Sequence, residues 1–494
     1  MKVYKKKSTF SIINQLNETN SELAKKLIEN LILDKERVFI FEDNKEYSGI
    51  HLLEKINKKS KKLFSNKNKI VILNSKNTTD WVITYIAAKL VNKVIFIVSD
   101  KIQKKLINKI NENFSISGVF KNNKLYINEK KRNLNKNHIF NDKKAYDCIF
   151  TSGTSGKPKA VCIEEDSYIY VAKLLIKKSK QTKDDIELLS MPFSHSFGIA
   201  RLRASILNNQ SFFVSDGLKN FPKIYKMFFK ININGLSLVP AAIEIVKFML
   251  RNEVKKFAAK IKYFEIGSSS LSDTNRKWLK DNFLTTNIFH HYGMTEASRS
   301  FFINRGNKDK VSISNNNVGN PAEGIAFKLR NMKNYKNKNI GEILIKGPHL
   351  AAGYFLINKK IEFVKISKWY KSGDIGSINN KELILLGRVN SMINVGGHKV
   401  YSEEIEEIVN KLDPIKDSIC SSILDKVYGE VPGLIIEKKR NLQISDNEVI
   451  IKINKIFRSY PSYKRPKKII CTSKLPLTSN GKKIRNKNVI QKFF

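Results

Sequence analysis

The chain has few residues of the kinds that cross-link or anchor a fold. Its 494 residues include four cysteines, Cys148, Cys162, Cys420 and Cys471, with no CxxC pair and no histidine at metal-ligand spacing. This pattern argues against a disulfide framework and a structural zinc site. The opening segment MKVYKKKSTFSIINQLN has no continuous apolar core of the signal-peptide type, and no apolar run reaches membrane-spanning length. We therefore expect a soluble, cytoplasmic protein of two or three domains.

Negative charge is also scarce. The 45 Asp and Glu residues stand against 90 Lys and Arg residues, which gives a formal net charge of +45. Such a surplus attracts nucleic-acid phosphates, but the lysines are dispersed, as in KKSKKLFSNKNK, without the interleaved aromatics of a base-stacking platform. We expect no membrane span and no specific nucleic-acid partner. The basic surface would suit an acidic protein partner, and the residues do not indicate an oligomeric state.

The order of apolar runs predicts the fold class. Runs suited to buried strands, such as RVFIF, KIVILN and KVIFIVSD, alternate with the helix-period segments SGIHLLEKINKKSKKL and DWVITYIAAKL. GLSLVP and YFEIGSSS repeat the pattern of a strand followed by a turn. This alternation predicts an α/β protein with parallel sheets. From about residue 310, short runs such as IAFKLR, GEILIKG and KELILLGR predict antiparallel strands or a small barrel, and segment 128–144 predicts an exposed loop.

The segment TSGTSGKPKAV, residues 151–161, is dense in glycine, hydroxyl and lysine residues. A nucleotide-hydrolase P-loop would require Gly at 151 and a hydroxyl residue at 158, and the chain has Thr151 and Pro158. The glycines and hydroxyls still suit anion binding, although a solvated loop is the plainer alternative. The extended run that follows predicts a hairpin between two strands.

Eight motifs in order resemble the acyl-adenylate-forming, or AMP-binding, superfamily, which includes acyl-CoA synthetases, luciferases and peptide-synthetase adenylation domains. They span residues 151–487 and read TSGTSGKPKAV, MPFSHSFG, YFEIGSSSLS, HHYGMTEAS, GEILIKGPHLAAGYF, WYKSGDIG, GRVNSMINVGGHKVYSEEIEE and LPLTSNGKKIRNK. The resemblance implies a large N-terminal domain, residues 1–387, of two α/β subdomains plus a small β-barrel-like part. A small mobile α+β domain, residues 388–494, would rotate about a hinge near Asn390.

The resemblance also implies which residues bind ATP and Mg²⁺. The phosphates would be held by Thr151, Ser152, Gly153, Thr154, Ser155, Gly156, Lys157 and Lys159. Tyr292 would stack on adenine, which Ser268 and Ser269 would flank. Asp374, assisted by Arg388, would accept hydrogen bonds from both ribose hydroxyls. Thr295 would contact phosphate and Glu296 would bind Mg²⁺.

Three further assignments concern the reaction itself. Lys482 would bridge the substrate carboxylate and the α-phosphate, and His195 would border the acyl pocket. Gly396 and Gly397 would admit a pantetheine thiol, and the helix after them would begin with Ser402 as its cap. The residues alone allow plainer interpretations: Glu296 as a helix cap, Asp374 as a turn residue, Tyr292 as a core aromatic and Lys482 as a solvated lysine. The chain departs from the family at Asn390, where Asp or Lys is usual, and at Ala352, where Arg is common.

The motif around residues 193–198 also bears on the substrate. It lacks the Asp that holds an amino-acid ammonium, and Phe193, Phe197, Phe212 and Phe213 favour an uncharged organic acid. The first interpretation is an ATP-dependent, AMP-forming ligase that joins a small-molecule carboxylic acid to coenzyme A. The second is an enzyme that loads the phosphopantetheine of an acidic acyl carrier protein. A degenerate protein that binds nucleotide or nucleic acid without turnover is the third.

Overall fold

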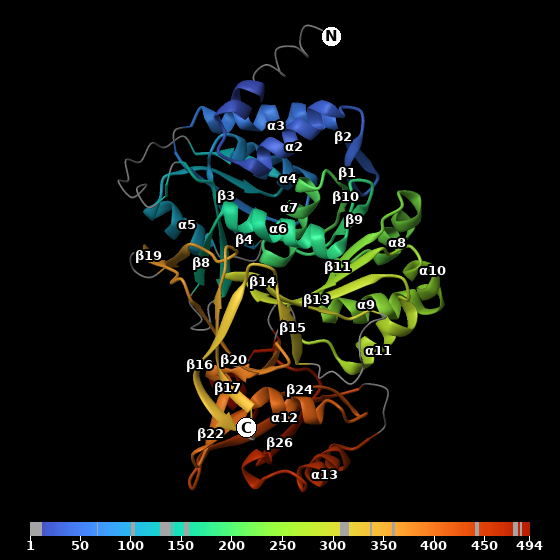
Figure 1. The fold of residues 1–494 in the computed structure, drawn as a ribbon, viewed down its shortest axis with the longest axis vertical. Helices are drawn as coiled ribbons and strands as arrows, with labels where there is room; N and C mark the ends of the chain where they lie inside the picture. The colour runs from blue at the N-terminus through green and yellow to red at the C-terminus, as the bar shows by residue number, and fades with distance from the viewer. Residues whose placement is uncertain are drawn as a thin grey trace. The chain divides into compact units, whose positions relative to one another are not determined.

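The computed structural model in Figure 1 describes residues 12–66, 68–99, 104–128, 140–141, 143–152, 158–306, 316–335, 338–357, 361–439, 444–477, 483–484 and 487–494. The chain divides into two compact units. The first consists of residues 1–326 and 345–370, and the second of residues 327–344 and 371–494. A hinge near Asn390, with a boundary between residues 387 and 388, stays a prediction. Most of the segment predicted as an exposed loop, 128–144, lies outside the described residues.

The first sheet of unit 1 joins the N-terminal α/β segment to the hairpin that carries the glycine-rich loop. Its strands, in sheet order, are β19 (Ile361–Lys365), β18 (Gly353–Ile357), β8 (Pro158–Glu164), β7 (Tyr146–Ser152), β4 (Val94–Ser99), β3 (Ile70–Ser75), β5 (Ile116–Lys121) and β6 (Lys124–Ile127). Strands β3, β4, β5 and β7 pair in parallel. β7 and β8 are antiparallel, with Ser152 opposite Pro158, so the predicted hairpin is confirmed.

The second sheet of unit 1 carries the later motifs. Its strands, in sheet order, are β15 (Asn317–Pro321), β14 (Ala297–Asn304), β13 (Asn287–Met294), β12 (Tyr263–Ile266), β11 (Gly235–Leu238), β9 (Ile186–Leu189), β10 (Ser211–Val214), β1 (Val38–Glu42) and β2 (Lys45–Ser48). The strands from β13 through β12, β11, β9 and β10 to β1 are parallel neighbours. The predicted α/β class with parallel sheets is confirmed.

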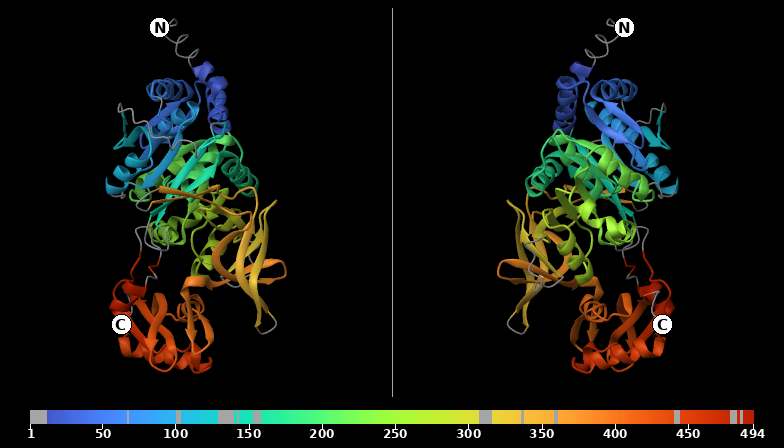
Figure 2. Two further views of the ribbon diagram at one scale, coloured as in Figure 1. Left: turned by 90° about the vertical axis from the view of Figure 1, so that its left-hand side faces the viewer. Right: turned by 90° about the vertical axis from the view of Figure 1, so that its right-hand side faces the viewer.

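Helices cover these sheets, and several begin at a side-chain cap. Ser21 and Thr78 accept hydrogen bonds from the backbone N–H groups of Ala24 and Trp81, which satisfies donors that have no partner within the helix. Helices α6 and α7 lie side by side (Figures 1 and 2). The helices are α2 (Glu22–Leu33), α3 (Gly49–Phe64), α4 (Thr79–Leu90), α5 (Lys104–Asn113), α6 (Glu165–Ser179), α7 (Ser196–Leu207), α8 (Phe221–Lys230), α9 (Pro240–Leu250), α10 (Val254–Ala258) and α11 (Asp273–Asn282). Among the described residues, none of the helices is both long and apolar enough to cross a bilayer.

Unit 2 contains the strands predicted after residue 310, of which β20 (Tyr370–Asn379) and β21 (Glu382–Arg388) pair antiparallel, and the C-terminal α+β part. Strands β16 (Ala326–Tyr335), β17 (Lys338–Lys346), β20 and β21 are successive neighbours. A further sheet contains β23 (His398–Tyr401), β22 (Met392–Val395), β25 (Gly429–Lys438) and β24 (Ile415–Asp425), with β26 (Lys468–Thr472) beside β25. The α-helices described in unit 2 are α12 (Ser402–Val409), α13 (Asp446–Phe457) and α14 (Lys487–Ile490).

A buried ionic cluster joins β7 to two helices of unit 1. Asp147, which lies four residues before the glycine-rich loop begins, is fully buried, 2.9 Å from Lys89 Nζ of α4 and paired with Arg203 of α7. The Tyr85 hydroxyl donates to the same carboxylate at 2.7 Å. Burial alone would raise the pKa of Asp147, but the two cations hold it below its usual value. The carboxylate is therefore charged and fixes β7 against α4 and α7.

Replacing Asp147 with Asn should strongly destabilise the protein. The change leaves Lys89 and Arg203 buried without their counter-charge, and the loss of one partner of a buried ion pair costs about 3–5 kcal/mol of the free energy of unfolding. Urea unfolding of the purified variant measures this cost. Asp184→Asn, at an exposed carboxylate, should unfold like the wild type. A loss for Asp147→Asn below about 1 kcal/mol would show that the cluster is not a stabilising contact.

Candidate active site

The motif HHYGMTEAS forms the hairpin of β13 and β14. Met294 pairs with Ala297, so Thr295 and Glu296 occupy the turn between the two strands. The strands pair irregularly beyond the turn. Tyr292 lies opposite Phe301, so between this pair and the Met294–Ala297 pair β14 has more residues than β13. A β-bulge of this kind re-aims side chains and is frequent beside active sites.

The Glu296 carboxylate is the charged centre of this hairpin. Residue Glu296 is 6% exposed, and its carboxylate lies 2.6 Å from Nζ of Lys159 on β8. The ammonium of Lys159 also lies over the Tyr354 ring, 4.2 Å from its centroid. The backbone N–H of Ala351 donates to the Glu296 carbonyl at 2.9 Å. Two predicted site residues 137 positions apart in the chain, Lys159 and Glu296, are therefore in direct contact.

Two tyrosines that the sequence analysis did not select also surround Glu296. Burial, followed by the negative charge of Glu296, raises the pKa of Tyr354 to about 12. Burial and the same carboxylate also raise the pKa of Tyr370. Both hydroxyls are therefore protonated donors at neutral pH. Tyr354 lies in the motif GEILIKGPHLAAGYF and Tyr370 in WYKSGDIG. Their place within these motifs was the one signal in the sequence that could have selected them as site residues.

The arrangement fits a magnesium ion held mainly by ATP. Mg²⁺ is usually bound by one or two carboxylates together with substrate phosphates and water. Among the described residues, no group of three or more His, Cys, Asp or Glu side chains could enclose a metal. Glu296 is the predicted carboxylate, and Lys159 balances its charge in this structure.

The glycine-rich loop connects β7 and β8 at the end of the first sheet. Thr151 is the last described side chain before it, and among the described residues no group hydrogen-bonds its buried hydroxyl. A buried hydroxyl without a partner is costly, so this one suits a ligand that supplies an acceptor. Gly153, Thr154, Ser155, Gly156 and Lys157 lie outside the described residues, as does the Ser152 side chain. Their phosphate contacts stay a prediction.

The residues predicted to bind adenine lie at the carboxyl ends of two neighbouring parallel strands, β12 and β13. This edge of an open α/β sheet is the usual place for a ligand. Ser268 has φ +82°, and a Cβ on Gly267 would lie 2.1 Å from the His291 ring, so this turn requires glycine. The carbonyl of Ser269 lies 3.0 Å from His290 Nε2. Tyr292 is half-buried, with its ring edge-on to Phe301.

The motif MPFSHSFG leads into α7. His195 is the N-cap residue of this helix and is partly exposed. The Ser196 hydroxyl lies 3.5 Å from the Thr295 hydroxyl, which places the start of α7 beside the β13–β14 turn. The structure revises the argument from phenylalanines. All four phenylalanines belong to the buried core, and the Phe197 ring also lies 5.0 Å from the His291 ring, measured between centroids.

Unit 2 carries the residues predicted to bind ribose. Asp374 and Arg388 lie opposite each other on β20 and β21, and Arg388 Nε is 3.0 Å from Asp374 Oδ1. The Ser372 hydroxyl accepts from the Asp374 backbone N–H at 3.0 Å and donates to the Ile343 carbonyl at 2.8 Å. Asp374 is 6% exposed and stands directly after Gly373, which has φ +73°. A local network therefore fixes its direction.

The predicted thiol loop is a tight hairpin. Gly396 and Gly397, with φ of +54° and +91°, connect β22 to β23, where Val395 pairs with His398. Two consecutive positive-φ residues are the signature of a type I′ turn, which favours glycine. A Cβ on Gly397 would meet no atom within 4 Å. The backbone of this loop is thus accessible on that side, as a thiol path would require.

The predicted hinge segment differs from the expectation in one respect. Asn390 lies in a 3₁₀ turn, Val389–Ser391. Ser402 does not cap α12, because Tyr401 is the N-cap residue and the Ser402 hydroxyl donates to the Ser391 carbonyl at 2.8 Å. Glu403 accepts a hydrogen bond from the Ser391 hydroxyl at 3.0 Å. The side chains of Ser402 and Glu403 therefore hold the 3₁₀ turn. The sequence pattern could not show this, because a serine that contacts a preceding turn and a serine that caps the helix occupy the same kind of position.

The catalytic lysine predicted at position 482 lies outside the described residues. Its neighbour Lys483 is described: Nζ lies 3.0 Å from Glu406 Oε2 and 2.7 Å from Asp417 Oδ1. Lys483 is therefore committed to ion pairs within unit 2, and the assignment of the catalytic role to Lys482 stays a prediction.

Comparison with known proteins identifies the family. The model of AMP-binding enzymes matches residues 33–355, and that of the AMP-binding enzyme C-terminal domain matches residues 404–482. The chain therefore belongs to the AMP-binding enzyme family, and the predicted membership is confirmed.

Curated relatives are acid–CoA ligases. The chain is 26% identical over 340 residues to 2-succinylbenzoate–CoA ligase of Listeria monocytogenes, covering 69% of this chain and 68% of the relative. It is 28% identical over 340 residues to oxalate–CoA ligase of Saccharomyces cerevisiae, covering 68% of this chain and 61% of the relative.

Solved structures share the fold. O-succinylbenzoate CoA synthetase of Bacillus subtilis, in complex with its acyl-adenylate intermediate, aligns with a TM-score of 0.75 at 18% identity and covers 94% of this chain and 97% of that one. ATP-bound MatB of Rhodopseudomonas palustris aligns with a TM-score of 0.75 at 16% identity, and the alignment covers 96% of this chain and 98% of that one. The predicted fold, with a large N-terminal and a small C-terminal part, is confirmed.

Proposed function

We propose that this protein is an AMP-forming acid–CoA ligase. It would join a small-molecule carboxylic acid to the α-phosphate of ATP with release of pyrophosphate, and then transfer the acyl group to the thiol of coenzyme A. The observation that carries the proposal is the contact between Lys159 of the glycine-rich hairpin and Glu296 of the YGMTEAS hairpin. Membership of the AMP-binding enzyme family and the names of the relatives support it.

The first half-reaction brings a carboxylate against a polyphosphate, so the site must neutralise negative charge and align the two groups. When bound, Mg²⁺ would neutralise phosphate charge, with Glu296 as its protein ligand. Lys159 and the hydroxyls of Thr151 and Thr295 would bind phosphate oxygens, and Lys482 would stabilise the charge that develops between the carboxylate and the α-phosphate. Tyr354 and Tyr370 would orient Glu296 through hydroxyls that stay protonated.

In unit 1, Tyr292 would offer its half-buried ring to adenine, which Ser268 and Ser269 would flank. Asp374 presents acceptors to the vicinal ribose hydroxyls and keeps its direction through Arg388 and Ser372. His195 would border the acyl group. In the second half-reaction, Gly396 and Gly397 would let the thiol pass close to the backbone.

Replacing Asp374 with Asn should raise the KM for ATP and leave the KM for the acid unchanged. The change removes the charge that strengthens the hydrogen bonds to ribose, and a hydrogen bond to a charged group contributes about 1.5–3 kcal/mol. This corresponds to a rise of about 10- to 150-fold in the KM for ATP. Steady-state kinetics with each substrate varied in turn measures both constants. An equal rise in both would indicate a general disturbance of the site.

An enzyme that loads a carrier protein is the alternative, and the net charge of +45 favours an acidic acceptor. The two acceptors can be compared directly. The protein is incubated with ATP, Mg²⁺, a panel of organic acids, and either coenzyme A or an acidic carrier protein bearing phosphopantetheine. Mass spectrometry then detects the acyl-thioester and AMP. Acyl-CoA with AMP supports the ligase, thioester on the carrier alone favours the alternative, and ADP in place of AMP would contradict both.

A further inference from the structure

Arg299 is a buried arginine in a strained position on β14. It lies three residues after Glu296, in the irregular stretch of the β13–β14 hairpin, and its side chain is 1% exposed. Its φ is +57°, a region that large L-residues avoid at a cost of roughly 1–3 kcal/mol. Such strain persists only where surrounding contacts determine it, and it gathers at functional sites.

The contacts of Arg299 join the β13–β14 hairpin to the start of α7. Its guanidinium donates to the carbonyls of Ser196 and Phe197, at 2.9 and 3.0 Å, in the first turn of the helix. It also donates to Ser298 Oγ at 3.0 Å. The same side chain therefore links the strand that follows the Thr295–Glu296 turn to the helix turn that follows His195.

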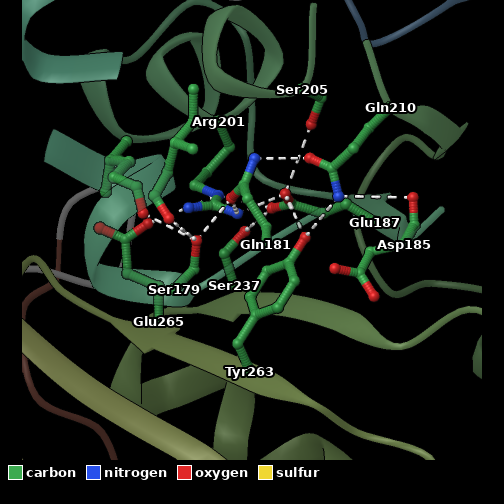
Figure 3. Close-up of polar contacts among 12 residues, drawn as sticks. Ser179, Gln181, Asp185, Glu187, Arg201, Ser205, Gln210, Ser237, Tyr263 and Glu265 are labelled. Carbon is green, nitrogen blue, oxygen red and sulfur yellow. Dashed lines mark hydrogen bonds and ion pairs between the residues drawn. The ribbon is translucent and has the colours of Figure 1, made fainter. Parts of the chain in front are cut away.

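A charged network behind the guanidinium fixes its orientation. Nε of Arg299 donates to Glu265 Oε1 at 3.2 Å, and the other oxygen of Glu265 lies 3.6 Å from Arg201 Nε. Arg201 in turn pairs with Glu187 (Figure 3). Burial alone would raise the pKa of Glu265, but the charge of Arg299 and the contact with His291 Nδ1, 2.7 Å from Oε1, lower it to about 2.

The buried charges of this network balance. Burial and the charge of Arg299 lower the pKa of His291 below its usual value, although the Glu265 carboxylate opposes this shift, so the ring is neutral at neutral pH. The two carboxylates of Glu187 and Glu265 then stand against the two guanidiniums of Arg201 and Arg299. Loss of Arg299 alone would leave one excess negative charge, and an uncompensated buried charge is destabilising. Arg299 thus has two roles that can be tested separately: its charge balances the buried carboxylates, and its guanidinium donates two hydrogen bonds to α7.

We infer that Arg299 is a positioning residue that holds the first turn of α7 in register with the Thr295–Glu296 turn. The inference rests on the proposed function, in which the turn serves ATP and Mg²⁺ and the start of α7 borders the acid. A single planar fork spans both elements. Lysine cannot replace it, because one ammonium cannot donate to both α7 carbonyls and to Glu265 in this planar geometry.

The test separates positioning from charge balance. Arg299→Met removes both, and the double variant Glu265→Gln/Arg299→Met restores the buried charge balance without the fork. We expect the single variant to unfold at lower urea concentration and the double variant to recover most of the loss. Acid-dependent exchange of pyrophosphate into ATP should still fall by about 100-fold in the double variant, the cost of a misplacement of about 1 Å. Arg299→Lys should show a similar fall, whereas Arg251→Lys, at an exposed arginine, should not.

A readout without turnover completes the test. Amide hydrogen exchange of a peptide covering residues 193–200 should be faster in the double variant than in the wild type, and a peptide from α2 should be unchanged. Recovery of both stability and wild-type exchange activity in the double variant would overturn the inference, as would unchanged protection of residues 193–200. Absence of activity in the wild type would instead count against the proposed function, and the amide exchange would still decide the role of Arg299.

Discussion

Glu296→Gln is expected to lower acid-dependent exchange of pyrophosphate into ATP by about 100- to 1000-fold. The amide keeps the shape of the side chain but removes the charge that would bind Mg²⁺, and it also removes the counter-charge of Lys159, 2.6 Å away. The binding of ATP without Mg²⁺ should change little. Exchange kinetics at several Mg²⁺ concentrations measure the effect, and a higher Mg²⁺ concentration should restore part of the lost rate.

The control for this variant is Glu323→Gln. Glu323 is an exposed carboxylate that also pairs with a lysine, Lys177, so the same chemical change is made away from the hairpin. It should leave exchange at the wild-type rate. If Glu296→Gln kept wild-type exchange with an unaltered Mg²⁺ dependence, Glu296 would be a structural partner of Lys159 and not a metal ligand.

The second large effect concerns Lys482. Lys482→Ala should lower acyl-adenylate formation by about 100- to 1000-fold, because the alanine variant has no group for the proposed role of the ammonium, which is to stabilise the developing charge. Thioester formation from a supplied acyl-adenylate and coenzyme A should be nearly unchanged, since the proposed function assigns that step to the Gly396–Gly397 loop. The two half-reactions, assayed separately, would give this split.

Lys474→Ala is the matched control, because Lys474 is an exposed lysine of the same unit. Equal losses in both half-reactions of Lys482→Ala would indicate damage to the whole protein. Wild-type adenylation in this variant would refute the assignment of the catalytic lysine.

The strand and helix pattern was predictable because most segments have one consistent periodicity. KIVILN, residues 69–74, overlaps β3, Ile70–Ser75, and DWVITYIAAKL lies within α4, Thr79–Leu90. Cross-chain contacts were less predictable. The meeting of Lys159 with Glu296 follows from the resemblance of both motifs to one family, and no local pattern in either segment encodes it.

Arg299 could not be found from the sequence. Its motif neighbours continue as RSFFIN, a strand pattern in which an arginine would be read as solvent-facing. The bulge and its positive φ arise from tertiary contacts with α7 and Glu265, and a single sequence does not encode these locally. Tyr354 and Tyr370 were missed for a related reason. A tyrosine beside a motif is usually a core residue, and only the position of Glu296 gives these two a second role.

The most direct test of the central claim is exchange of labelled pyrophosphate into ATP, run with the wild-type protein over a panel of short, long, aromatic and amino acids. The account predicts exchange that requires Mg²⁺ and one class of organic acid and is lost in Lys482→Ala. Exchange with amino acids alone would contradict the assignment of an organic-acid substrate. Measurable ATP binding without exchange for any acid in a broad panel would contradict the claim that this chain forms an acyl-adenylate.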